Sequence, residues 1–103
     1  MNLLTEELIE RFKEYPLYSQ DGKGKDSIVL AKFFNPCGQG DWIITEAEPQ
    51  DDGDWLLFGY CHIFEWEWGY VLLSELENLK LPFGLTIERD RHISKNAKVK
   101  DLI

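Results

Sequence analysis

The chain has 103 residues, a hydrophobic fraction of 44% and a formal charge of −8. This length supplies one hydrophobic core and the composition is outside the range of disordered chains, so we predict a single domain over residues 1–103. The apolar runs are too short to cross a bilayer and the N-terminus lacks a signal-peptide pattern, which predicts a cytoplasmic protein without membrane contact.

The first expected element is an amphipathic helix near the N-terminus. Thr5 can cap this helix, Leu8 and Phe12 recur on one of its faces, and Pro16 ends it. The segment 20–25 contains two Gly-Lys pairs, but it lacks the longer glycine-flanked loop of a phosphate-binding motif. We therefore expect a plain loop there and no nucleotide or other cofactor.

Five segments have the composition or the alternation of β-strands. The first three are residues 28–34, 42–48 and 55–64. Residues 65–70 lead into the fourth strand, and residues 87–93 form the fifth. Strict alternation in the second segment places Trp42, Ile44, Glu46 and Glu48 on one side and Ile43, Thr45 and Ala47 on the other. In the fourth segment, alternation predicts that Glu65 and Glu67 point outward and that Trp66, Trp68 and Tyr70 point inward.

A second, shorter helix is expected after the fourth strand. Ser74 followed by Glu77 has the spacing of a capping box, which predicts a helix over residues 75–79 that ends before Pro82. The elements together predict an α+β fold, with a mostly antiparallel sheet of about five strands, an N-terminal helix and a short second helix. The basic segment 94–103 is expected to be a flexible tail.

Charge is segregated along the chain. Residues 33–79 contain ten Asp and Glu, no Lys or Arg, and all four tryptophans. Such a stretch repels nucleic-acid phosphates and attracts a basic protein, so we predict a basic protein partner and no DNA or RNA binding through this region. The residues expected to form the binding surface are Asp41, Glu46, Glu48, Asp51, Asp52, Glu65, Glu67, Trp66 and Trp68. The alternative is that the aromatic residues are core and that the acids only keep the protein soluble.

Two places contain residue types that are able to carry catalysis. His62 lies on an apolar strand beside Cys61, and Glu88, Asp90 and His92 alternate onto one face of the last strand. The ordinary explanations are a structural histidine and a charged edge strand that resists aggregation. No catalytic motif or metal-type Cys-His spacing is present, so we assign no catalytic residue and no metal.

Several short segments together resemble a known family. They are Pro16-Leu17-Tyr18, Lys32-Phe33-Phe34-Asn35-Pro36, Trp42-Ile43-Ile44-Thr45-Glu46, Leu57-Phe58-Gly59, Gly69-Tyr70, Leu73-Ser74-Glu75-Leu76 and the stretch from Gly84 to Asp90. On these segments the chain resembles domain-of-unknown-function family 2958 over nearly its whole length. The chain departs from the family pattern at Trp68, where a leucine is more usual, and in having Cys61 and His62.

The resemblance implies a biological setting rather than a mechanism. Members are similar to small proteins of bacterial plasmids, integrative elements and phages, and no catalytic residues carry over. Our leading hypothesis is an accessory or anti-defence module that binds a basic, nucleic-acid-handling host protein in the bacterial cytoplasm. A small hydrolase or nuclease that depends on a metal or a histidine is the alternative, and assembly through a sheet edge is a third possibility.

Overall fold

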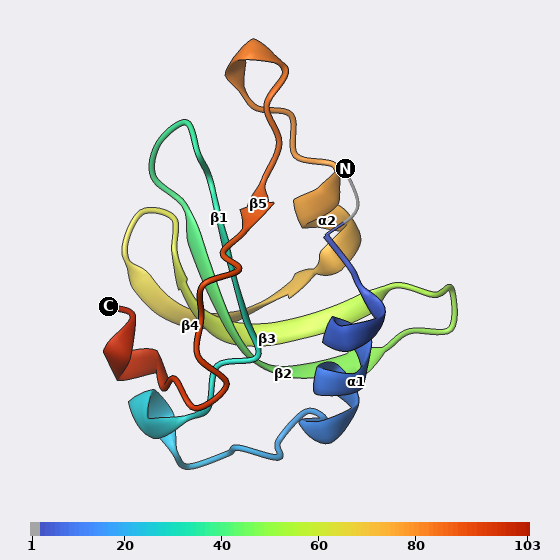
Figure 1. The fold of residues 1–103 in the computed structure, drawn as a ribbon, viewed down its shortest axis with the longest axis vertical. Coiled ribbons are helices and arrows are strands. Elements are labelled where there is room, and N and C mark those ends of the chain that lie inside the picture. Colours follow the sequence, from blue (N-terminus) through green and yellow to red (C-terminus); the bar gives the residue numbers. More distant parts are fainter. Residues whose placement is uncertain (1–2) are drawn as a thin grey trace.

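A computed structural model describes residues 3–103, which form one antiparallel sheet with helices packed against it (Figure 1). The strand order is β4-β3-β2-β1-β5. In chain order the elements are α1 (Glu6–Glu14), η1 (Gly24–Asp26), β1 (Ala31–Phe34), β2 (Asp41–Pro49), β3 (Trp55–His62), β4 (Trp66–Leu72), α2 (Leu73–Glu77), η2 (Pro82–Gly84), β5 (Glu88–Arg89) and η3 (Val99–Asp101). The predicted fold class is confirmed.

Helix α1 forms for the reasons that its sequence indicates. The Thr5 side chain accepts a hydrogen bond from the Leu8 N–H at 3.2 Å, which satisfies one of the free donors at the helix N-terminus. Leu8 and Phe12 are buried on one face, and Phe12 packs against the Trp55 ring with a centroid distance of 5.2 Å. The helix ends at Glu14, shortly before Pro16, as predicted.

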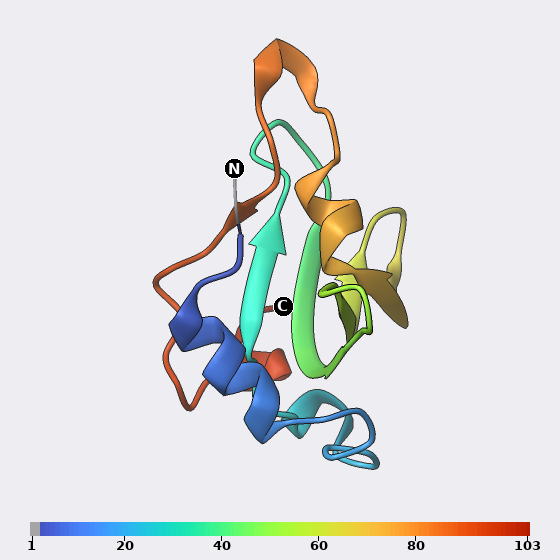
Figure 2. The same cartoon turned by 90° about the vertical axis from the view of Figure 1, so that its right-hand side faces the viewer.

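The two faces of the sheet are covered by different parts of the chain. Helices α1 and α2 lie on one side, and the C-terminal segment with η3 lies on the other (Figures 1 and 2). The helix side contains the main core, which includes Phe12, Phe33 and Leu57. The C-terminal side contains a smaller cluster of Val29, Ile43 and Val99. The sheet is therefore the middle layer of the molecule.

The C-terminal segment packs on the sheet, which differs from the flexible tail expected for residues 94–103. Val99 is fully buried, and the Val29 N–H donates to the Ala97 carbonyl at 2.9 Å. The Lys100 ammonium also lies 2.8 Å from the Asp26 carboxylate. The tail composition is basic, but Ala97 and Val99 supply the apolar side chains that hold the segment in place.

Strand β2 contains a bulge that changes the expected alternation. Ile44 pairs with Gly59 and Glu46 pairs with Phe58, so Thr45 is an extra residue that the register of β3 skips, and its hydroxyl donates to the Phe58 carbonyl at 3.3 Å. After the bulge Ala47, instead of Glu46, joins Trp42 and Ile44 in the main core. Glu46 consequently lies on the opposite face, beside Phe58.

The first and last strands are shorter than predicted because their ends bond elsewhere. The Val29 N–H donates to the Ala97 carbonyl of the C-terminal segment, and the Leu30 N–H donates to the Ile44 carbonyl of β2. The regular part of β1 therefore begins at Ala31. Beyond β5 the Asp90 carboxylate accepts the His92 N–H at 2.9 Å, which turns the chain away from the sheet.

The N-terminus of α2 also differs from the prediction. Glu75, rather than Glu77, closes the first turn by accepting the Leu72 N–H at 2.8 Å. The Ser74 hydroxyl donates to the Asp54 carboxylate and thereby lowers the pKa of Asp54. Glu77 accepts the Leu3 N–H at 2.9 Å. The helix therefore begins earlier than expected, and its polar side chains bond to neighbouring segments.

We predict that Gly59→Ala severely destabilises the protein. A Cβ atom at Gly59 would lie 2.0 Å from the Ile43 carbonyl oxygen, whereas the paired position in β4, Gly69, has no atom within 4 Å. Urea unfolding is expected to show a loss of about 3 kcal/mol for Gly59→Ala, because overpacking against backbone is not relieved by side-chain rotation. Gly69→Ala is the matched control, and an equal loss in both variants would contradict the close contact.

Candidate functional site

The predicted acidic surface is divided between separate places in the fold. Glu48, Asp51 and Asp52 are exposed at or near the turn that precedes β3. Glu65 and Glu67 are also exposed, but they lie after the C-terminal end of β3, at the start of β4. Asp41 is half-buried, and its carboxylate lies 3.9 Å from both the Lys32 ammonium and the His62 ring. Glu46 is only 5% exposed. The acids therefore do not form one continuous surface.

Strands β3 and β4 together carry a continuous ladder of six aromatic rings on the face opposite the main core. Ring-centroid distances of 4.7, 5.1, 4.8, 5.7 and 4.9 Å join His62, Trp66, Tyr60, Trp68, Phe58 and Tyr70 in that order. The contacts are either directly across the two strands or diagonal between them. We call this set the aromatic ladder.

One end of the aromatic ladder is covered and the other is open. Tyr60 and Trp66 pack against the small cluster that contains Val99. Trp68 and Tyr70 are 37% and 54% exposed, although alternation predicted that both point inward. The alternation itself is correct, but the side that carries these rings is the partly uncovered face of the sheet.

A pocket of about 420 Å³ adjoins the open end of the ladder. Phe58, Trp68 and Tyr70 line it together with Tyr18 from the segment that follows α1. The four buried polar residues of the described chain, Gln20, Ser27, Thr45 and Glu46, also line it. The pocket thus combines exposed aromatic rings with a buried polar group, which is the usual composition of a ligand site. We call it the tyrosine pocket.

Glu46 holds the segment that contributes Tyr18 to the pocket. One carboxylate oxygen accepts the Tyr18 N–H at 2.8 Å, and the other accepts the Gln20 N–H at 2.9 Å. The Gln20 side chain in turn donates to the carbonyls of Ile28 and Thr45, both at 2.8 Å. The bulge in β2 directs Glu46 to this face, so the shape of the pocket depends on the bulge.

Tyr18 has a backbone conformation that is unfavourable for its residue type. Its φ angle is 72°, in the left-handed region that bulky residues rarely adopt, and the side chain is 71% exposed. Strained backbone of this kind is concentrated at functional sites. Folding therefore holds Tyr18 in an unfavourable conformation, with its exposed ring at the pocket that Trp68 and Tyr70 also line.

The electrostatic environment of the tyrosine pocket is negative. A hydrogen bond with the Tyr18 side chain is the main reason that the pKa of Tyr70 is raised; burial raises it further, and the charges of Glu46 and Asp21 add smaller contributions. No Lys or Arg among residues 3–103 lines the pocket. Glu48, two residues beyond Glu46 on β2, adds an exposed carboxylate to the same face.

His62 and Cys61 do not form a catalytic pair. Cys61 is buried in the main core, where burial and then the Glu67 charge raise the pKa of its thiol to about 11. His62 lies on the opposite face of β3, stacked on Trp66 at 4.7 Å. Adjacent residues of a strand point to opposite faces, so their side chains cannot act on one substrate.

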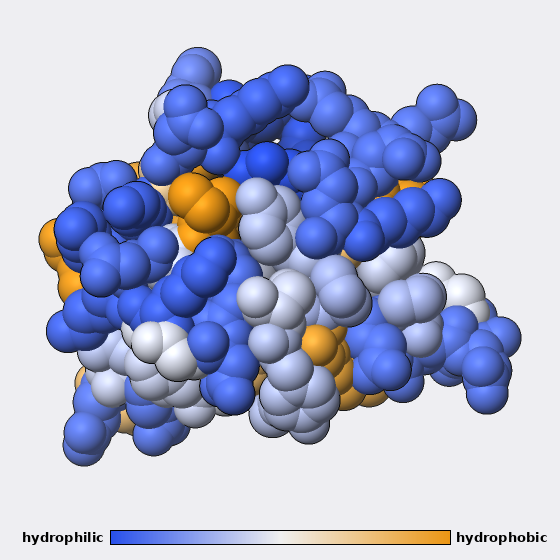
Figure 3. All heavy atoms as spheres, turned by 90° about the horizontal axis from the view of Figure 1, so that it is seen from below, coloured by the Kyte–Doolittle hydropathy of each residue, from blue (hydrophilic) through white to orange (hydrophobic). Residues whose placement is uncertain are grey.

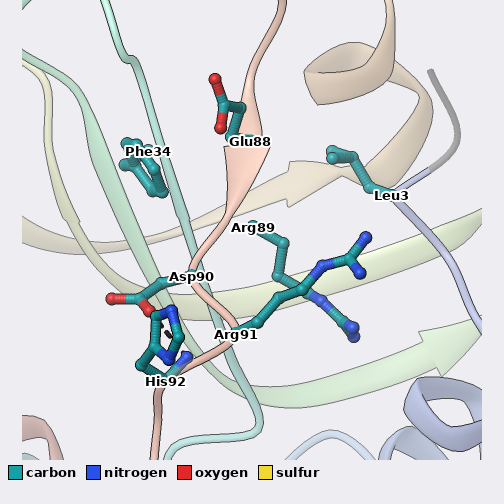
Figure 4. Close-up of a pocket in the computed structure, with 7 residues that line it drawn as sticks. All are labelled: Leu3, Phe34, Glu88, Arg89, Asp90, Arg91 and His92. Carbon is teal, nitrogen blue, oxygen red and sulfur yellow. Dashed lines mark hydrogen bonds between the residues drawn. The ribbon is translucent and has the colours of Figure 1, made fainter.

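Glu88, Asp90 and His92 line a second depression of about 460 Å³ (Figure 4). The side chains of Arg89 and Arg91 extend to one side of this segment, and Asp90 and His92 lie on the other. The Asp90 carboxylate accepts a hydrogen bond from the His92 backbone N–H. Within residues 3–103, no three His, Cys, Asp or Glu side chains are grouped so as to hold a metal ion.

Comparison with known proteins gives one result for this chain. The model of the family described as protein of unknown function, DUF2958, matches residues 3–102. The chain belongs to the DUF2958 family. No curated protein and no solved structure shows a significant match. Among the helices of residues 3–103, none has the length and hydropathy needed to span a bilayer.

Sequence reasoning missed most of the tyrosine pocket. Gln20 and Asp21 belong to the segment 20–25, for which no nucleotide site was expected, Tyr70 was expected to point inward, and Tyr18 and Phe58 were not singled out as site residues. One signal was present: Tyr18, Glu46, Phe58 and Tyr70 all lie in segments that carry the DUF2958 resemblance. Those segments are far apart in the sequence, and only the folded sheet brings them to one place.

We predict that Glu46→Gln destabilises the protein by about 2 kcal/mol. The amide NH₂ would face one of the two backbone N–H groups that Glu46 now satisfies, which leaves a buried donor unpaired. Glu48→Gln, at an exposed position on the same strand, is the control and should change stability by less than about 0.5 kcal/mol. Urea unfolding measures both, and equal effects would contradict the structural role of Glu46.

The two cysteines are expected to differ in reactivity. Cys37 is exposed, whereas Cys61 is buried and the pKa of its thiol is raised to about 11. Because the thiolate is the reactive form, iodoacetamide should modify Cys37 in the folded protein and leave Cys61 unmodified until unfolding. Peptide mapping by mass spectrometry checks this, and early modification of Cys61 would show that β3 opens readily.

Proposed function

We propose that this DUF2958 protein is a non-enzymatic module that binds a basic, nucleic-acid-handling protein through the open end of its aromatic ladder. The observation that carries the proposal is the exposure of Tyr18, Trp68 and Tyr70 on one face, next to a pocket with buried polar groups. Aromatic residues in partly exposed clusters are the residue types that dominate protein interfaces.

Charge supports a basic partner. The chain has a net charge of −8, the exposed acid Asp21 lines the tyrosine pocket, and Glu48 is an exposed acid on the same strand as Glu46. A negative surface steers cationic proteins to it and repels phosphate backbones. The surface seen from below is mostly hydrophilic with small, separate apolar areas (Figure 3), which suits a partner that associates and dissociates rather than a permanent apolar interface.

Within residues 3–103, no metal-holding group of side chains supports the competing hydrolase hypothesis. His62 stacks on Trp66 in the aromatic ladder, and the Asp90 carboxylate accepts a hydrogen bond from the His92 backbone N–H. A partner taken from a host defence or gene-expression system fits the resemblance to proteins of phages and mobile elements, and this part of the proposal rests on that resemblance alone.

The test is affinity capture of tagged protein from bacterial lysate, followed by measurement with the purified partner. We expect a basic protein to be recovered at low salt and lost at about 0.5 M salt, where surface electrostatics are screened. Trp68→Ala should weaken its binding about 30-fold, as expected for an interface aromatic whose loss costs about 2 kcal/mol. Glu48→Gln should mainly slow association.

Phe64→Ser is the matched control for this experiment. Phe64 is 90% exposed in the turn between β3 and β4 and has no ring contact with the ladder. Its replacement should leave partner binding unchanged. Unaltered binding in Trp68→Ala, or equal losses in both variants, would refute the proposed surface.

A further inference from the structure

We propose that the tyrosine pocket binds an arginine side chain of the partner. This inference rests on the proposed function and names the group that the open aromatic surface recognises. Four aromatic residues, Tyr18, Phe58, Trp68 and Tyr70, line a volume of about 420 Å³. A planar guanidinium stacks on aromatic faces and hydrogen-bonds at its edge, so it suits a pocket that has both rings and polar atoms.

The charges around the pocket favour a cation. Asp21 and Glu46 line the pocket together with Tyr70, and their charges contribute to the raised pKa of Tyr70. Lys23 and Lys25 belong to the same loop, but neither lines the pocket. The Asp21 and Glu46 carboxylates disfavour an anionic ligand, and a neutral ligand would gain nothing from their charge.

The chain itself shows that this aromatic surface accepts cations. The Lys25 ammonium lies over the Tyr60 ring, 5.5 Å from its centroid, in the middle of the aromatic ladder. Trp68 is the next ring after Tyr60 and faces the tyrosine pocket. An arginine of the partner over the Trp68 ring would make the same cation–π interaction at the neighbouring ring of the aromatic ladder.

The pocket is held in shape before any ligand arrives. The two hydrogen bonds to Glu46 fix the left-handed conformation of Tyr18, and the ladder fixes Trp68 and Tyr70. Rings that are already in position lose little conformational entropy on binding. This arrangement explains why an exposed tyrosine is kept at an unfavourable φ angle.

The experiment is an NMR titration of the full chain with N-acetyl-arginine N-methylamide. The citrulline analogue is the matched control ligand, because it has nearly the same shape without the charge. We expect shifts of the Trp68 indole N–H and of the Tyr18 and Gly22 amides, and binding at least about fivefold tighter for the arginine probe. Equal binding of both probes, shifts elsewhere on the protein, or no shifts at about 50 mM would overturn the assignment.

Variants separate the pocket from the rest of the surface. Trp68→Ala should abolish the shifts, and Asp21→Asn, at an exposed loop position, should weaken arginine binding two- to threefold with no change for citrulline. Phe64→Ser should change neither. An Asp21→Asn variant that binds arginine as well as the parent would refute the charge argument.

The probe uses no partner, so its failure is distinguishable from failure of the proposed function. If the arginine probe does not bind but Trp68→Ala still weakens the captured partner, the arginine assignment is wrong and the binding surface stands. If the probe binds the pocket but no basic protein depends on Trp68, the pocket assignment stands and the proposed function is wrong.

Discussion

The Glu46 carboxylate is the contact on which the rest of the open face depends. It is nearly buried, and it accepts the backbone N–H groups of Tyr18 and Gln20. Without these bonds the Tyr18 and Gln20 N–H groups would lose their acceptors on the sheet, and the left-handed conformation of Tyr18 would lose its support. The bulge at Thr45 directs Glu46 to this face. A single extra residue in β2 therefore connects the sheet register to the shape of the tyrosine pocket.

The two faces of the sheet have different physical roles. The helix face buries Phe33, Ile44 and Leu57 and supplies most of the hydrophobic stabilisation. On the other face, one part is covered by the cluster that contains Val99, and the remaining part exposes the rings of Trp68 and Tyr70. The aromatic ladder spans both regions, so the covered rings hold the open ones in place. A rigid support beneath an exposed surface is what a specific binding site requires.

Local patterns predicted the elements well and their surroundings less well. Thr5 and Pro16 mark the ends of α1, and alternation correctly divides β4 into two sides. Alternation does not reveal which side is covered, so it placed Trp68 and Tyr70 inward, although Trp68 is also one of the residues expected on the binding surface. The bulge at Thr45 leaves no clear local signal, and Glu46 was consequently expected on the wrong side of β2. Glu46 is also one of the acids expected on the binding surface, because charge alone does not reveal that a carboxylate is buried.

The sequence alone determined the α+β class, the N-terminal helix, the strand segments and the concentration of acids and aromatics in residues 33–79, because these follow from local composition and spacing. It also carried the resemblance to DUF2958. Tertiary structure decided that the acids are dispersed, that residues 94–103 pack on the sheet, and that Tyr18 meets Trp68 and Tyr70. These outcomes depend on contacts between segments distant in the chain, which local periodicity does not encode.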